Sequence, residues 1–279
     1  MNYRTILVYV DGSRHLAKRI EVAAQLAMTY DAHLVGIACT GISRFYYQSG
    51  EMVMASAVPP INIDWIYAHA NHRLQAFGEA VERSGVRSYE KRLVNDEAAA
   101  ALALHARYAD LVVIGQIDHD ESLPATPADL PEYVTVNCTR PVLVIPNAHS
   151  VKKIGHHILV AWDGSPEAIR AISASIPLLQ LAKNVTVALF NVQPSDGVHG
   201  EEPGADIALY LARHDVTISV EQFHPIDKIG ESIVSLAAAR DIDLIVMGCF
   251  GHSRFREVMM GGVTLTMLKA MPAPLLLSH

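Results

Sequence analysis

A glycine-rich segment follows an apolar run in the second half of the chain. Residues 244–247 read LIVM, and the glycines after them are spaced Gly-x2-Gly-x9-Gly-Gly, at Gly248, Gly251, Gly261 and Gly262. Glycines directly after a parallel strand let backbone amides approach a ligand, because no Cβ intervenes, and the N-terminus of a following helix offers unpaired N–H groups and a positive dipole. A glycine after a strand is more often only a tight turn. With a strand before it and a helix after it, this segment suits a phosphate group.

A second candidate is the Asp-Gly-Ser turn at residues 163–165, which follows the apolar run 158–162. Ligands of open α/β sheets bind beside the carboxyl ends of the strands, where this turn is expected. Because a carboxylate repels phosphates, Asp163 suits a nucleoside hydroxyl or amino group better than the phosphate end. The alternative, that Asp163 caps the helix after it, stays open.

Other reactive residue types do not form a recognisable site. Fourteen histidines and three cysteines are present, but no HExxH or CxxC spacing occurs. Ser13 and Ser165 follow glycines, yet the GxSxG motif of serine hydrolases is absent, and helix N-caps explain both serines. Glu257 is the only acid in the glycine-rich segment. The sequence therefore predicts no metal site and no catalytic residue.

The elements that must position these residues occur twice. Residues 6–13 read ILVYVDGS and residues 158–165 read ILVAWDGS, an offset of 152, and the later runs ADLVVIG and IDLIVMG end at Gly115 and Gly248. Each half closes with an apolar run after a proline. A length of 279 residues is close to two domains of roughly 150 residues. We therefore predict two domains, 1–147 and 156–279, separated by a polar linker.

Within each half, short β-branched runs alternate with longer segments of helical period. This pattern is typical of βαβ units on a parallel sheet, and the strands lack polar alternation, as expected when helices cover both faces. The fold class is therefore α/β. The expected helices begin near Leu16 with a buried stripe of Ile20, Ala23 and Ala27, and continue at about 66–81, 96–108, 205–213 and 229–239, with a further helix after Ser165 that Pro177 should kink or end.

Taken together, these motifs resemble a tandem universal stress protein over nearly the whole chain. The nucleotide-binding subgroup of that family is identified by Gly-x2-Gly-x9-Gly-Ser/Thr. Here Gly262 stands where Ser or Thr is usual, which removes a hydroxyl donor but keeps the backbone N–H, and Thr264 follows two residues later. The resemblance implies two Rossmann-like domains, each a five-stranded parallel sheet with helices on both faces, paired about a pseudo-two-fold axis.

The same resemblance implies that the second half binds ATP or a related adenine nucleotide, alone or with magnesium. Asp163 and Val192 would lie at its nucleoside end. The residues implied around the phosphates are Met247, Gly248, Gly251, His252, Gly261, Gly262, Val263 and Thr264.

The first half departs from this pattern. The segment after Gly115 reads QIDHDESLPATPADLP, with four acids, no Lys or Arg, and no further glycine. A triphosphate would meet repulsion and bulky backbone there. We expect this half to have lost the phosphate site while keeping the fold, including Asp11 at the equivalent turn. Its expected role is structural pairing with the second half or binding of a different ligand.

Charge and hydropathy exclude other classes of function. The net charge is −7 and no basic tract exists, which disfavours binding to nucleic acid or to acidic lipid. No apolar run approaches the roughly 20 residues of a membrane span, and residues 6–10 are too short for a signal-peptide core. A cytoplasmic location is therefore expected, with the three thiols as ordinary buried side chains.

The leading interpretation is a stress-response protein whose second half binds an adenine nucleotide in a regulatory, non-catalytic role. One alternative is an interaction module without nucleotide, which recruits a partner through residues 41–63, a long aromatic and methionine-rich connection. An ordinary surface loop is the interpretation favoured for that connection. The other alternative is a slow, metal-dependent ATP hydrolase that requires Asp163. Assembly into a homodimer stays open.

Overall fold

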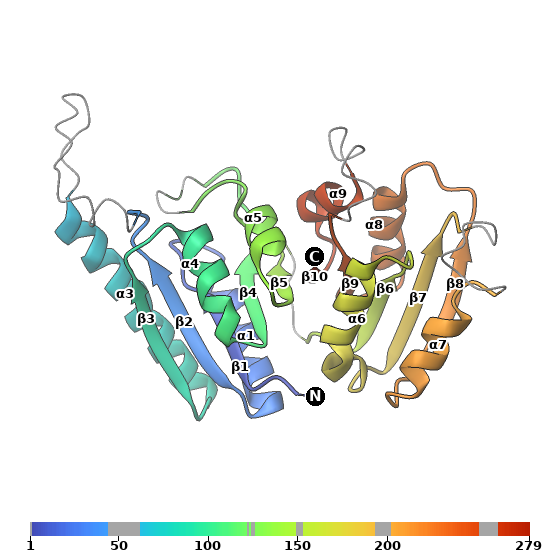
Figure 1. Ribbon diagram of the computed structural model, residues 1–279. Helices are drawn as coiled ribbons and strands as arrows, with labels where there is room; N and C mark the ends of the chain where they lie inside the picture. The colour runs from blue at the N-terminus through green and yellow to red at the C-terminus, as the bar shows by residue number, and fades with distance from the viewer. Residues whose placement is uncertain are drawn as a thin grey trace.

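The chain folds into one α/β structure built from two similar halves (Figure 1). The computed structural model describes residues 2–43, 62–121, 123, 126–148, 153–192, 202–250 and 262–279. The first half contains β1 (Thr5–Tyr9), α1 (Leu16–Tyr30), β2 (His33–Cys39), α3 (Ile63–Ser84), β3 (Tyr89–Val94), α4 (Ala98–His105) with a 3-10 turn at Ala106–Tyr108, β4 (Leu111–Gly115), α5 (Leu130–Asn137) and β5 (Val142–Ile145). The second half contains β6 (His157–Ala161), α6 (Pro166–Leu179), β7 (Asn184–Phe190), α7 (Ala205–Ala212), β8 (Ser219–Phe223), α8 (Ile229–Ala239), β9 (Leu244–Gly248), α9 (Val263–Ala270) and β10 (Leu275–Ser278). Most of the 41–63 connection lies outside the described residues.

The strands form a single ten-stranded sheet in the order β3-β2-β1-β4-β5-β10-β9-β6-β7-β8. Within each half the pairing is parallel, and the two halves have the same strand order read outward from the centre. This confirms the predicted α/β class and the five parallel strands in each half. The two sheets join because β5 and β10 pair antiparallel, with Leu143 opposite Leu276. An apolar edge strand otherwise leaves a row of backbone groups unpaired, and this pairing satisfies them.

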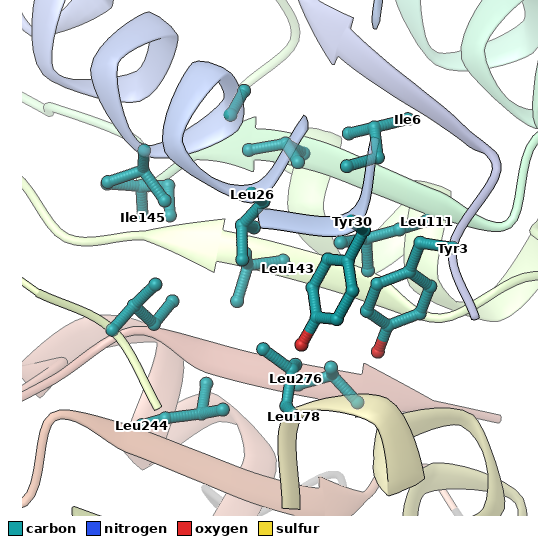
Figure 2. Close-up of a cluster of buried hydrophobic side chains, with 14 of the residues drawn as sticks. Tyr3, Ile6, Leu26, Tyr30, Leu111, Leu143, Ile145, Leu178, Leu244 and Leu276 are labelled. Atoms are coloured by element: carbon teal, nitrogen blue, oxygen red, sulfur yellow. The ribbon is translucent and has the colours of Figure 1, made fainter. Parts of the chain in front are cut away.

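The hydrophobic core also continues across the junction. Figure 2 shows Tyr3 and Tyr30 of the first half beside Leu178 and Leu276 of the second. The Tyr3 hydroxyl donates a hydrogen bond of 2.7 Å to the carbonyl of Ala174 in α6, and the two tyrosine rings meet edge to face with centroids 5.1 Å apart. Burial raises the pKa of both tyrosine hydroxyls, so they stay protonated at neutral pH.

The helices follow the expected apolar stripes. Ile20, Ala23 and Ala27 of α1 are buried, and α6 begins after Ser165, whose Oγ accepts a hydrogen bond of 3.1 Å from the amide of Ala168. The prediction of Ser13 as an N-cap is wrong: α1 begins three residues later, and the Ser13 hydroxyl accepts from the amide of His15. The α6 helix continues only two residues beyond Pro177. Of the described helices, none has the length and apolar character to cross a bilayer.

In each half, an aspartate of the repeat accepts hydrogen bonds from backbone amides at the amino-terminal end of the parallel strands. Asp110, just before β4, accepts hydrogen bonds of 2.8 and 2.9 Å from the amides of Arg4 and Thr5. Asp243, just before β9, accepts from three consecutive amides at residues 155–157, at 3.0 to 3.1 Å. The aspartate in the repeated runs ADLVVIG and IDLIVMG therefore has a structural role at the edge opposite the glycine-rich segment.

Replacing Asp243 with alanine is expected to lower the free energy of unfolding by about 2 kcal/mol, because three part-buried amides lose a charged acceptor. Urea unfolding followed by circular dichroism measures the change. The control is Asp227→Ala, since Asp227 is exposed and a surface substitution of this kind changes stability by less than about 0.5 kcal/mol. Equal stability of the two variants would contradict the structural role.

Candidate functional site

The second half brings several of the predicted residues to one edge of the sheet. Strands β6, β7 and β9 are parallel neighbours, with Ala161 opposite both Ala188 and Met247. Their carboxyl ends therefore lie side by side. Asp163 follows β6 by two residues, Val192 follows β7 by two residues, and Gly248 is the last residue of β9. Three segments that are far apart in the sequence thus supply one shared edge.

The helix α9 starts at the far side of the glycine-rich segment. Gly251, His252 and Gly261 fall in 251–261, outside the described residues, whereas Gly262 is the N-cap of α9 and Val263 and Thr264 form its first turn. Gly262 has no side chain to accept from that turn, and the first amides of any α-helix lack intrahelical partners. Within the described residues, no side chain caps the first amides of α9, and the helix dipole is positive at this end.

Gly248 packs directly against the start of α6. A Cβ built on Gly248 would lie 2.5 Å from the amide nitrogen of Ala168 and 2.7 Å from the carbonyl carbon of Glu167. Only a residue without a Cβ allows α6 to approach the end of β9 this closely. The glycine at this position therefore has a packing reason that is independent of any ligand.

Asp163 forms a local turn and is not the cap of α6. Its Oδ1 accepts a hydrogen bond of 3.0 Å from the amide of Ser165, and the cap is the Ser165 hydroxyl. The side chain of Asp163 is exposed, and its Oδ2 has no hydrogen bond to any described residue. One carboxylate oxygen thus shapes the turn, and the other is available to a ligand at the sheet edge.

Asn191 is a residue at this edge that the sequence interpretation missed. Its side-chain amide donates to the carbonyl of Ile226 at 2.5 Å and its Oδ1 accepts from the Ile226 amide at 2.8 Å. This two-point contact holds the connection between β8 and α8 against the end of β7, next to Val192. Asn191 has a positive φ of 54°, a conformation that asparagine tolerates better than most residues. A polar residue directly after an apolar strand was the available signal.

The equivalent turn in the first half is chemically different. Asp11 Oδ1 accepts from the amide of Ser13 at 3.0 Å, and Oδ2 accepts from Arg19 Nη1 at 2.9 Å. Arg19 is only 2% exposed and also donates to the Tyr9 carbonyl at 2.7 Å. In the second half, the position equivalent to Arg19 is Ala171 at the same offset of 152. Both carboxylate oxygens of Asp11 are therefore engaged inside the protein.

The acidic segment after β4 lies against the start of α1. Asp118 forms an ion pair with Arg14 and lies within hydrogen-bond distance of His15 Nε2, at 3.1 Å, and Glu121 accepts from the Arg14 amide at 3.1 Å. Hydrogen bonds from the Asp120 amide, Arg14 and His15 lower the pKa of the Asp118 carboxyl. These acids line a cavity of about 360 Å³ that also contacts Asp11. A surrounding of carboxylates disfavours a phosphate, as the sequence predicts for this half.

Thiol and metal chemistry have no evident centre in the described part of the chain. Cys39, Cys138 and Cys249 are buried. Burial raises the pKa of the Cys39 and Cys249 thiols to about 12, so neither is a thiolate at neutral pH. Across the described ranges, no group of three or more His, Cys, Asp or Glu residues is arranged to hold a metal ion.

Comparison with known proteins agrees with this architecture. The sequence model of the universal stress protein family matches residues 155–279, whereas no curated protein matches the sequence. A universal stress protein from Archaeoglobus fulgidus DSM 4304 is 13% identical with a TM-score of 0.71, and the match covers 98% of this chain and 97% of that chain.

Two further structures are similar. A functionally unknown protein from Pseudomonas aeruginosa PAO1 is 16% identical with a TM-score of 0.59, over 99% of this chain and 92% of that chain. A universal stress protein from Archaeoglobus fulgidus, solved in complex with dAMP, is 17% identical over 52% of this chain and 98% of its own length, with a TM-score of 0.37. At identities this low, the matches with TM-scores of 0.71 and 0.59 show a shared fold and nothing about the ligand of this chain. The universal stress protein family model therefore matches the second half of the chain, residues 155–279, and the first half repeats the same fold.

Proposed function

We propose that the second half binds an adenine nucleotide, with ATP as the leading candidate, in a regulatory role. The observation that carries this proposal is the convergence of Asp163, Val192 and Gly248 at one sheet edge, within the region that the family model matches. Asp163 Oδ2 would accept from a ribose hydroxyl or an amino group. The donors for the phosphates would be the first amides of α9 and the backbone of the glycine-rich segment.

The two halves differ in a way that supports one nucleotide per chain. Among the described residues, Asp163 Oδ2 accepts no hydrogen bond, whereas Asp11 Oδ2 accepts from buried Arg19. After β9 the second half has the glycine-rich segment, whereas after β4 the first half has the acidic segment 118–121. We propose that the first half acts as an intramolecular partner of the second, with the division at 1–147 and 156–279. A requirement for magnesium, a cytoplasmic location and assembly into a homodimer stay predictions.

The test is calorimetric titration with ATP, with and without magnesium, of the full chain and of Gly261→Trp. An indole in the glycine-rich segment is expected to weaken ATP affinity by about 100-fold or more, because it fills the space that the phosphates need. The matched control is His119→Trp, which places the same side chain in the exposed acidic segment of the first half. That variant should bind one ATP as tightly as the unmodified protein.

Two results would contradict the proposal. If Gly261→Trp folds normally and binds ATP with unchanged affinity, the glycine-rich segment is not the site. If the unmodified protein releases no nucleotide on denaturation and shows no affinity at millimolar ATP, the interaction-module interpretation replaces nucleotide binding, and Gly262 in place of Ser or Thr favours that interpretation. Release of ADP during titration with magnesium, lost in Asp163→Ala, would instead indicate slow hydrolysis.

A further inference from the structure

Gln116 of the first half holds the last turn of α9 in the second half. Its Nε2 donates hydrogen bonds of 3.0 and 2.9 Å to the carbonyls of Leu268 and Lys269. Its Oε1 accepts from the amide of Asn147, at 3.0 Å, so the side chain itself is fixed between β4 and the residue after β5. One side chain thus connects the carboxyl ends of β4 and β5 with α9, whose Leu268 lies 152 residues further along the chain.

The helix α9 is short enough to depend on such a contact. It has eight residues, and isolated helices of this length are marginal in water. The last four carbonyls of a helix lack intrahelical partners. Here the amide of Met271 donates to the Met267 carbonyl, and Gln116 supplies donors to the next two. Amide hydrogens at this end also complement the negative pole of the helix dipole.

The opposite end of α9 starts at Gly262, where the glycine-rich segment ends. The helix is about 12 Å long, and its buried residues Met267 and Leu268 fix one face against the core. Because the helix has little more than two turns, we expect loss of the contact at its last turn to change the position or the order of its first turn. The equivalent residue of the second half does not repeat the contact that Gln116 makes. At the equivalent position of the second half, Cys249 directs its thiol to the Ser278 carbonyl of its own half, at 3.3 Å.

We propose that Gln116 is a positioning residue for the nucleotide site of the other half. It anchors the C-terminus of α9 so that the amides at residues 262–264 stay in place for the ligand. The inference rests on the proposed function and gives the first half, which lacks a phosphate loop, a role in that function. The occupant of the site remains an adenine nucleotide, and Gln116 does not contact it.

The decisive variant is Gln116→Glu. Glutamate keeps an acceptor for the Asn147 amide but turns a carboxylate oxygen toward the Leu268 and Lys269 carbonyls, so that only the contact with α9 is lost. The matched control is Tyr3→Phe, which removes another hydrogen bond between the halves, that of the Tyr3 hydroxyl with Ala174 in α6, and does not touch α9. Hydrogen exchange of peptides from α9 and β9 in the ligand-free full chain, and calorimetric ATP affinity, are measured for both variants.

Gln116→Glu is expected to speed exchange in α9 but not in β9, and to weaken ATP affinity by about three- to tenfold, the range for one or two hydrogen bonds. Tyr3→Phe should leave both quantities unchanged. Unchanged α9 exchange in Gln116→Glu overturns the inference, as does faster exchange with unchanged ATP affinity. An unmodified protein that does not bind ATP overturns the proposed function as well as the inference, and the exchange data still report whether Gln116 anchors α9.

Discussion

Replacing Asp11 with alanine is expected to lower the free energy of unfolding by about 3–5 kcal/mol, because it leaves the Arg19 guanidinium buried without its carboxylate. Arg19 is 2% exposed and Asp11 is 5% exposed, so the substitution leaves a buried charge without its partner. The same substitution at the equivalent Asp163 removes an exposed side chain and should change the stability by less than about 0.5 kcal/mol.

The two aspartates should also differ in their effect on the ligand. Asp163→Ala is expected to weaken nucleotide affinity by about tenfold, the loss for one hydrogen bond to a charged acceptor, whereas a destabilised but folded Asp11→Ala should bind normally. Chemical unfolding gives the stability, and calorimetry at a temperature where both variants are folded gives the affinity. Equal loss of stability in both variants would show that the two turns are equivalent. Loss of affinity in Asp11→Ala alone would place the nucleotide in the first half.

Gly248→Ala is expected to cost about 2–3 kcal/mol of stability, toward the upper end for overpacking a well-filled interior. The clash is with the backbone of Ala168 and Glu167, at 2.5 and 2.7 Å from the new methyl group, so relief requires the start of α6 to move. Since α6 also carries the turn of Asp163, we expect nucleotide affinity to fall with the stability. Thermal unfolding and titration of the same preparation measure both effects.

The control is another glycine-to-alanine change. A Cβ on Gly78 in α3 would lie 3.4 Å from the flexible Lys91 side chain, and alanine is favoured over glycine within a helix by about 0.5–1 kcal/mol. Gly78→Ala should therefore be neutral or stabilising and should not affect the nucleotide. If Gly248→Ala is equally harmless, the close approach of α6 to β9 is not required for the fold.

The internal repeat made most of the fold predictable. The offset of 152 residues between the two Asp-Gly-Ser turns, with continuous apolar runs before them, indicated two α/β halves of the same topology. Helical periodicity located α1 through Ile20, Ala23 and Ala27, and α8 at its observed bounds. These patterns can be read from short stretches of sequence, because burial of a strand on two faces and the period of a helix both determine the types of neighbouring residues. The glycine-rich segment and Asp163 were recognised for the same reason.

Contacts between distant residues were not predictable in this way. Arg19 occupies the carboxylate of Asp11, and Gln116 reaches α9, although their residue types alone would place both on the surface. Likewise, the apolar runs of β5 and β10 predicted strands but not their antiparallel pairing. The sequence by itself determined the α/β class, the repeat and the half that carries the glycine-rich segment. The tertiary structure alone decided that the two sheets become one, that Asp11 pairs with Arg19 while Asp163 Oδ2 accepts from no described residue, and that Gln116 of the first half contacts α9 of the second. Each of these depends on groups that are distant in the sequence and meet only when the chain has folded.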